Sequence, residues 1–585
     1  MNAPSSNAPR AADAAPSDVR RSPSPPRSVN APRSASGLSV AFVDLLELEP
    51  RLRLHTAGLR HALTFAFSAG GAQADIARAL SDAKPGPSLW SNDCFAEDLF
   101  LPALVERVLW RGRAAPRSSA GAGVKRYLIH MLGAPPTGAD GQQALAFRQA
   151  ISAELDATPA LRQRVGDLIG RIEALFDLLE AGGMGVRLDP VRRGLDILAA
   201  ARRVVDEASA FADASSGLRR ISDWANQVRA GVGYRRLVHL LDYDGRLASV
   251  QVNVRLGREG DVRSMEIVQI SENEQNPFHA SPWRRFWGRI SLGFRGYRLR
   301  KEEVFARLVH DTFDGIREVF AASLQLLGDL EFYRLGLSLG EFARERGLDV
   351  CLPRFGVSAE ARRIDALFNP FLLLEDRPPR PCDIQTGGFG AIVIITGPNS
   401  GGKTRLLQAI GLSQVLGQGG LFVPARAADL PWQDGVFASL SVAPEVDQRE
   451  GRLGTELLRI RRMFEKLEMG ALVLVDELCS GTNPAEAEEL FHMVVQLLIE
   501  ISAQAFVTTH FLEFAARLER SRELPGLEFL CVGLDADKRP TYRFERGVAD
   551  SALAQQTAQR LGVTHQELSA LVHAAQRRKS ERPGR

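Results

Sequence analysis

The chain has 585 residues, of which 45% are hydrophobic and 24% are charged, and these values are ordinary for a globular protein. The longest apolar runs, such as residues 391–395 and 471–475, are strand-sized and far short of the ~18 apolar residues that a membrane span needs, so a membrane protein is excluded. The five cysteines are scattered and lack the spacing of a zinc site, which indicates the reducing environment of the cytoplasm. The net charge of +3 is small, so any contact with nucleic acid depends on local clusters of charge.

The N-terminal half of the chain is expected to be mostly helical. Residues 1–38 are rich in proline, serine and arginine and predict a disordered tail, because they offer little apolar surface to bury. Residues 39–190 predict a helical, connector-like region. Residues 191–352 predict a helical lever region, in which alternation over 247–270 indicates a β-hairpin and the proline-free stretch 301–352 indicates one or two long helices.

After Pro353 the pattern changes to strand, loop and helix, which predicts an α/β domain over 353–548 and a helical tail over 549–585. Residues 391–404 read AIVIITGPNSGGKT, an apolar strand, a glycine-rich turn and the start of a helix. The glycines let backbone N–H groups surround a β-phosphate, and the helix start adds partial positive charge. Lys403 is expected to reach the β- and γ-phosphates, and the Thr404 hydroxyl to ligate Mg²⁺. The residues predicted to contact ATP in this P-loop segment are Gly397, Pro398, Asn399, Ser400, Gly401, Gly402, Lys403 and Thr404.

Two further strands are predicted to complete this site. Residues 471–477, ALVLVDE, end in Asp476, expected to hold Mg²⁺, and Glu477, expected to deprotonate the attacking water. The strand AFVTTH ends at His510, which is placed to sense the γ-phosphate. A histidine at a strand end is also compatible with a purely structural role.

These motifs resemble those of the MutS family. The resemblance rests on GPNSGGKT (397–404), VDELCSGTNPAEA (475–487), TTHFLEFAARL (508–518) and the helical segment 547–568. It covers about 330–585 and extends more weakly over 90–330. The resemblance implies helical levers followed by an ABC-like P-loop ATPase domain, ATP and Mg²⁺ as cofactors, DNA as partner, and a homodimer with composite ATP sites.

In that dimer a helix start from one subunit completes the ATP site of the other. The matching segment is 451–464, in which Gly454 and Thr455 stand where relatives carry a Ser-Thr-Phe pattern. The aromatic residue that stacks on adenine in the family has no match in 377–383, so we expect no base contact from that segment.

The family's mismatch-recognition domain carries a Phe-x-Glu wedge. Phe95-Ala96-Glu97 has those letters, but in a helical context without a preceding α/β domain, so we interpret the match as chance. The family's C-terminal nuclease-type domain has no match either. The resemblance is therefore to a shortened member.

Residues 282–301 combine seven basic residues with five aromatic residues and no acid. Such a segment suits DNA phosphate contacts and base stacking, and it is equally compatible with a solvated loop anchored by its aromatic residues. The candidate DNA-contacting residues are Arg284, Arg285, Arg289, Arg295 and Arg298.

The sequence thus predicts a MutS-like DNA-binding ATPase of mismatch repair or recombination. ATP would open and close a dimeric clamp on damaged, mismatched or branched DNA, without intrinsic mismatch specificity. An ATP-gated clamp acting on RNA or ribosomes is the alternative. A chromosome-organising ATPase is disfavoured, because only 73 residues separate Lys403 from Asp476 and leave no room for a long coiled coil.

Overall fold

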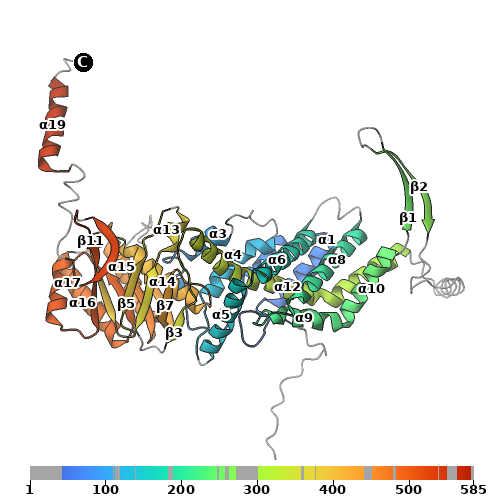
Figure 1. Cartoon of the computed structure of the whole chain (residues 1–585), viewed down its shortest axis with the longest axis horizontal. Helices are drawn as coiled ribbons and strands as arrows, with labels where there is room; N and C mark the ends of the chain where they lie inside the picture. The colour runs from blue at the N-terminus through green and yellow to red at the C-terminus, as the bar shows by residue number, and fades with distance from the viewer. Residues whose placement is uncertain are drawn as a thin grey trace, which may run out of the picture. The chain divides into compact units, whose positions relative to one another are not determined.

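Figure 1 shows the fold of the protein in a computed structural model of the whole chain. The predicted tail 1–38 and the arginine-rich segment 282–300 lie outside the described residues. Within the described part of the chain, no helix is both long and apolar enough to cross a bilayer. The structure describes residues 42–580 apart from 110, 112–118, 139, 182–188, 247–248, 257–261, 272–300, 357–360, 376, 399, 441–450, 479–482, 538 and 550–562.

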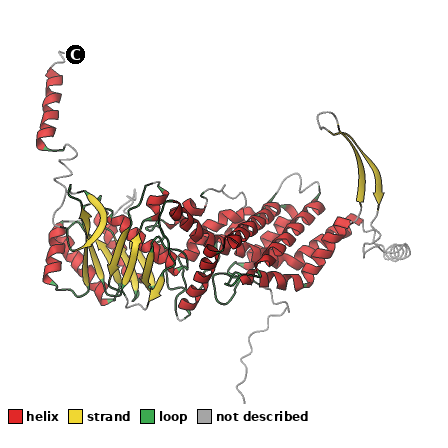
Figure 2. Cartoon of the chain, viewed as in Figure 1, coloured by secondary structure: helices red, strands yellow, loops and turns green. Residues whose placement is uncertain are grey.

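Helices form the N-terminal part of the described chain, as the sequence predicts (Figure 2). Helix α8 (Pro190–Ala208) illustrates the local cause. The Asp189 carboxylate accepts a hydrogen bond from the Arg192 amide at 2.9 Å, proline occupies the first turn, and Leu195, Leu198 and Val205 are buried on one face. The remaining elements are α1 (Thr56–Ala69), α2 (Gln73–Ser81), η1 (Asn92–Cys94), α3 (Leu101–Leu109), α4 (Ser119–Leu132), α5 (Gly141–Ala157), α6 (Pro159–Glu180), η2 (Ser209–Phe211), α9 (Arg219–Ala230) and α10 (Val232–Arg246).

The predicted hairpin and long helix are confirmed. Strands β1 (Ser249–Leu256) and β2 (Val262–Ser271) pair antiparallel. The stretch after residue 300 forms one helix, α12 (Lys301–Glu345), of 45 residues. Its central turns are buried among the N-terminal helices, so packing rather than helix propensity explains its length.

The described residues of the C-terminal part form two sheets, which confirms a mixed helical and α/β fold. One sheet has the strand order β12-β11-β6-β10-β9-β8, parallel except for β12. Its strands are β6 (Ile392–Thr396), β8 (Gly435–Ser439), β9 (Ala471–Val475), β10 (Gln504–Thr508), β11 (Leu527–Leu534) and β12 (Pro540–Arg546). The second sheet has the order β3-β7-β4-β5, from β3 (Arg354–Gly356), β4 (Arg362–Leu367), β5 (Cys382–Thr386) and β7 (Ala427–Pro431).

Helices cover both faces of the six-stranded sheet. Val393 and Ile395 of β6 join the hydrophobic cluster that contains α14, whereas Ile392 and Ile394 join the cluster of α16 and α17. This alternation explains why the strand is apolar throughout rather than at every second position. The helices of this part are α13 (Pro370–Leu374), α14 (Lys403–Gln418), α15 (Gly451–Lys466), α16 (Pro484–Glu500), α17 (Leu512–Ser521) and α19 (His565–Ser580).

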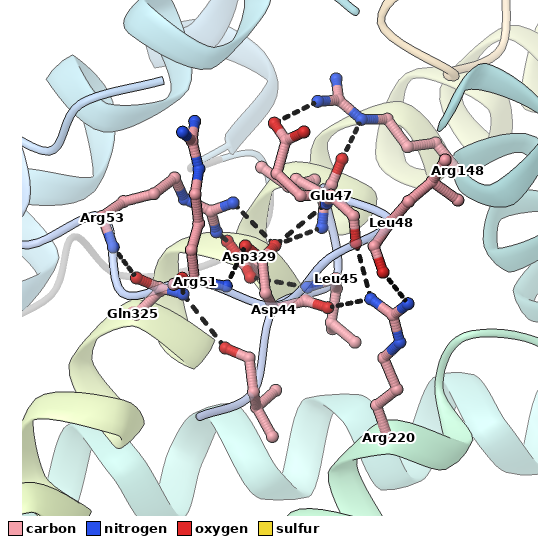
Figure 3. Close-up of polar contacts among 12 residues, drawn as sticks. Asp44, Leu45, Glu47, Leu48, Arg51, Arg53, Arg148, Arg220, Gln325 and Asp329 are labelled. Carbon is pink, nitrogen blue, oxygen red and sulfur yellow. Dashed lines mark hydrogen bonds and ion pairs between the residues drawn. The ribbon is translucent and has the colours of Figure 1, made fainter. Parts of the chain in front are cut away.

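A buried polar network fixes the first described segment, residues 42–54, to helix α12 (Figure 3). Arg53 forms ion pairs with both Asp44, at 2.7 Å, and Asp329 of α12, and all three side chains are inaccessible to solvent. The Asp329 carboxylate also accepts hydrogen bonds from the Tyr127 hydroxyl and, at 3.0 Å, from the Leu45 amide. Burial raises the pKa of Asp329 to about 6. The Arg53 guanidinium opposes this rise, and the charge of the nearby Asp44 carboxylate adds to it.

The same network reaches the end of α14. Arg148 of α5 donates to the Leu46 carbonyl at 2.7 Å and to the Gly419 carbonyl at 3.4 Å, and Ser152 donates to the Gly420 carbonyl at 2.8 Å. Gly420 has φ +93°, and a Cβ there would lie 2.5 Å from the Cβ of Arg148. The N-terminal helices therefore hold the C-terminal end of the helix that follows the P-loop segment.

Candidate functional site: a phosphate-binding loop beside an acidic strand end

The P-loop segment connects the buried strand β6 to helix α14 as predicted. Gly402 caps the helix with φ +90°, a conformation that costs glycine little. Gly397 has φ +131°, and a Cβ there would lie 2.8 Å from the Val532 side chain. A tight loop is thus required at both glycines. Such a loop can direct backbone N–H groups toward a phosphate.

Lys403 is the first residue of α14, and its side chain reaches back to the loop. Its side chain is buried, and its ammonium group donates to the carbonyl oxygens of Gly397 at 2.8 Å and Pro398 at 3.2 Å. Burial lowers the pKa of Lys403, while the carboxylates of Glu477 and Asp476 oppose that shift. A buried ammonium group at this place can form charge-assisted hydrogen bonds with the oxygen atoms of a polyphosphate.

The acidic strand end lies next to the loop, because β9, β10 and β6 are neighbours and their carboxyl ends meet at one edge. The Thr404 hydroxyl donates to Asp476 Oδ2 at 2.5 Å. The two residues predicted to bind Mg²⁺ therefore lie in direct contact, and both offer the hard oxygen atoms that Mg²⁺ prefers. The residues therefore fit an Mg²⁺ ion bound together with a nucleotide.

Thr508, at the end of β10, organises both acids, and the sequence alone did not single it out. Its hydroxyl donates to Asp476 Oδ1 at 2.5 Å and accepts from the Glu477 amide at 2.8 Å. Glu477 has φ +54°, which is uncommon for a residue other than glycine and costs on the order of 1 kcal/mol. The bond to Thr508 helps to hold this conformation. The sequence does contain a clue to Thr508: β9 and β10 are consecutive apolar strands of equal length, and if they pair in parallel their last residues become neighbours.

A cavity of about 500 Å³ opens beside the loop. Tyr542 of β12 lines this cavity together with Gly402, and a Cβ on Gly402 would lie 3.4 Å from its ring. The Arg380 guanidinium lies 5.5 Å from the centroid of the Tyr542 ring. Adjacent apolar and aromatic residues make the cavity suitable for a flat base. Those lining residues include Phe368, Leu372, Pro378 and Phe544.

Segment 377–383 lacks a stacking aromatic, as the sequence shows, but the fold brings Tyr542 to the same cavity. Tyr542 lies 139 positions after Lys403 in a strand without a recognisable motif. It becomes visible as a site residue only when β12 pairs with β11 beside β6.

Other predicted site residues are less closely defined. His510 is exposed two residues beyond the end of β10, and its ring centroid lies 4.1 Å from that of Phe511. Gly454 and Thr455 lie near the start of α15, and the contact predicted for them is with a second copy of the chain. Asn399 and the cluster of Arg284, Arg285, Arg289, Arg295 and Arg298 lie outside the described residues. These assignments stay predictions.

The interpretation of Phe95-Ala96-Glu97 as a chance match agrees with its packing. Phe95 is fully buried, and its ring meets the edge of Trp90 at a centroid distance of 5.6 Å. A side chain so placed contributes to the core and does not project toward a ligand.

Comparison with known proteins supports the site. Residues 393–579 match the family model described as MutS domain V. The chain is 32% identical over 289 residues to the endonuclease MutS2 of Thermus thermophilus, a match covering 48% of this chain and 36% of the relative. It is 34% identical over 193 residues to the endonuclease MutS2 of Thermomicrobium roseum, covering 33% of this chain and 24% of the relative. The matched region thus spans about a third or less of these relatives.

Proposed function

Because the chain belongs to the MutS family, we propose that it is a DNA-associated ATPase that binds ATP with Mg²⁺ between the P-loop segment and the acidic end of β9. The observation that carries the proposal is the contact of Thr404 with Asp476 beside buried Lys403. Through this contact the group proposed to bind phosphate lies beside the carboxylate proposed to bind Mg²⁺, which is the arrangement that phosphoryl transfer needs.

Each residue has a defined part in the proposed reaction. Lys403 binds the β- and γ-phosphates, and Thr404 and Asp476 hold Mg²⁺, which when bound neutralises charge on the phosphate oxygens. Glu477 orients the attacking water and accepts its proton. Thr508 keeps both acids in place through the two hydrogen bonds of its hydroxyl.

The base of the nucleotide is proposed to enter the cavity beside the loop. Tyr542 offers a stacking surface, and Arg380 packs over the same ring. This arrangement supplies the base contact for which segment 377–383 has no aromatic residue.

The remaining parts of the proposal concern DNA and assembly. We infer a cytoplasmic homodimer in which the start of α15, with Gly454 and Thr455, completes the ATP site of the partner. ATP binding then changes how helices such as α12 enclose DNA. The hydrogen bonds of Arg148 and Ser152 to the end of α14 support such coupling, because they link the P-loop helix to the N-terminal helices.

The DNA contacts are proposed to be backbone contacts that follow shape rather than sequence. Contacts between arginine and phosphate are indifferent to base identity, and discrimination of a mismatch requires an element that inserts at the lesion. We therefore expect a preference for junctions, forks or flaps over duplex and no preference for a mismatch.

Two measurements test the proposal. The purified chain should hydrolyse ATP only with Mg²⁺ present, and absence of hydrolysis would remove the enzymatic part. Gel shifts with matched, mismatched, branched and single-stranded DNA and with RNA, each with and without ATP, test the nucleic-acid part. Stronger binding to RNA than to every DNA would favour the alternative clamp on RNA or ribosomes.

The arginine cluster offers a sharper version of the binding test. Alanine at four of its five positions should lower affinity for every DNA and flatten its dependence on salt, since fewer counterions are released. Unchanged affinity and salt dependence would exclude the cluster as the DNA-binding surface. The four positions are Arg284, Arg285, Arg295 and Arg298.

A further inference from the structure

A loop of the N-terminal helical region, residues 90–99, contacts both ends of strand β8. Two residues before the strand begins at Gly435, the Trp90 indole N–H donates to the Gln433 carbonyl at 3.2 Å. At its end, the Asp98 carboxylate accepts from the Leu440 amide at 2.8 Å. Among the described strands, β8 is the last on its side of the sheet and pairs only with β9. A strand at a sheet edge has ladder bonds on one side only, so contacts from outside the sheet matter for its position.

The loop is itself firmly anchored. Phe95 and Leu99 are fully buried. Leu99 packs against α14 so closely that a Cβ on Gly411 would lie 2.6 Å from its side chain. The loop therefore fits between the P-loop helix and the edge strand, and its contacts with β8 are fixed relative to α14.

The end of β8 is also one step from the proposed metal-binding carboxylate. The Ser439 carbonyl accepts from the Asp476 amide at 3.0 Å, and the next amide along the chain, that of Leu440, donates to Asp98. Asp98 thus holds Leu440, which follows the residue whose carbonyl accepts the hydrogen bond of the Asp476 amide. A second link reaches α15, because Asp93 forms an ion pair with Lys466, the last residue of that helix.

We propose that loop 90–99 couples the N-terminal helical region to the ATP site by fixing the end of β8, and that Asp98 is a positioning residue for Asp476. The inference rests on the proposed ATPase function. Small displacements of a metal-binding carboxylate reduce turnover strongly, because phosphoryl transfer depends on alignment. Ground-state nucleotide binding depends mainly on the loop between β6 and α14, which Asp98 does not contact through this bond.

The test compares Asp98→Ala with Asp98→Asn in the full chain. Alanine removes the acceptor of the Leu440 amide, whereas asparagine keeps a carbonyl oxygen there. We expect Asp98→Ala to lower kcat about tenfold, the scale of a lost hydrogen bond to a charged group, with the Kd for ADP changed less than about twofold. Asp98→Asn should recover most of the loss. Asp189→Ala is the matched control, because it also removes a carboxylate that accepts one backbone N–H, but at the start of α8.

Amide hydrogen exchange gives a readout that does not require hydrolysis. In Asp98→Ala the amides of Leu440 and Asp476 should exchange at least about tenfold faster, since a lost hydrogen bond lowers the local opening energy. If the wild-type protein lacks ATPase activity, the proposed function fails while the exchange result still decides the inference.

Unchanged exchange and kcat in Asp98→Ala would overturn the proposed positioning role, as would an equal loss in Asp98→Asn. If Asp98→Ala does not fold, Trp90→Phe tests the other end of β8. It removes the indole donor and keeps an aromatic ring in the core. Faster exchange near β8 with a lower kcat would support the proposal, and no change in either would overturn it.

Discussion

Replacement of Tyr542 by alanine tests whether the cavity beside the P-loop segment receives the nucleotide base. Tyr542 is 43% exposed and lies against Gly402, with Arg380 over its ring. Stacking of a base on an aromatic side chain is worth about 1–3 kcal/mol, and a partly exposed ring belongs at the lower end of that range. About 1–1.4 kcal/mol corresponds to a five- to tenfold higher Kd for ATP.

Alanine is the appropriate replacement for a structural reason. Tyr542 has φ +60°, a conformation equally strained for tyrosine and alanine, so the substitution removes the ring without relieving the backbone. Glycine at this position would mix both effects. Tyr542→Phe keeps the stacking surface and should bind ATP within about twofold of the wild type.

The assay is equilibrium titration with ATP and, separately, with tripolyphosphate. The Tyr542→Ala variant should lose affinity for ATP and keep its affinity for tripolyphosphate, because Lys403 and the loop remain. Phe65→Ala on α1 is the control, since Phe65 is an exposed aromatic residue of the helical region. Equal affinity of wild type and Tyr542→Ala for ATP, or a parallel loss for tripolyphosphate, would refute base stacking at this position.

Further predictions concern catalysis, assembly and pH. Lys403→Ala should weaken ATP binding about ten- to hundredfold in the same titration, because a charge-assisted phosphate contact is lost. Glu477→Gln should bind ATP but hydrolyse it at least ~100-fold more slowly, and wild-type turnover would remove Glu477 from the mechanism. Glu477→Gln with ATP should also tighten a dimer in sedimentation, and a monomer unchanged by ATP would contradict composite sites. Finally, folding keeps the proton of Asp329 up to about pH 6, whereas the unfolded chain releases it near 3.8, so this group's contribution to stability falls as pH rises through that window. Asp329→Asn removes this contribution, so between pH 4.5 and 6.5 its Tm should fall less, or rise more, than the Tm of the wild type. An identical pH dependence of Tm in both proteins would show that Asp329 does not titrate there.

The sequence by itself determined the features that are local along the chain. The P-loop segment is contiguous, and the spacing of its glycines, Lys403 and Thr404 is recognisable in the sequence itself. The strand, the loop and the start of the helix were therefore predictable. The hairpin β1–β2 and helix α12 followed from periods of two and 3.6 residues, which any half-buried strand or helix must show. Two acids after a buried strand are also compatible with a solvated strand end, and only their combination with the P-loop segment predicted that Asp476 and Glu477 belong to the same site. Their roles with Mg²⁺ and water stay predictions.

Tertiary structure decided everything that depends on which distant segments become neighbours. Thr508 bonds both acids only because β10 pairs with β9, and Tyr542 reaches the cavity only because β12 pairs with β11 at the edge of the sheet. Asp98 reads as an ordinary acid in a helical context until the fold places it at the end of β8. Asp329 is likewise one acid in a long helix until burial beside Asp44 and Arg53 changes its proton affinity. Strand order and burial arise from the whole chain packing at once, and no local pattern of residues encodes them.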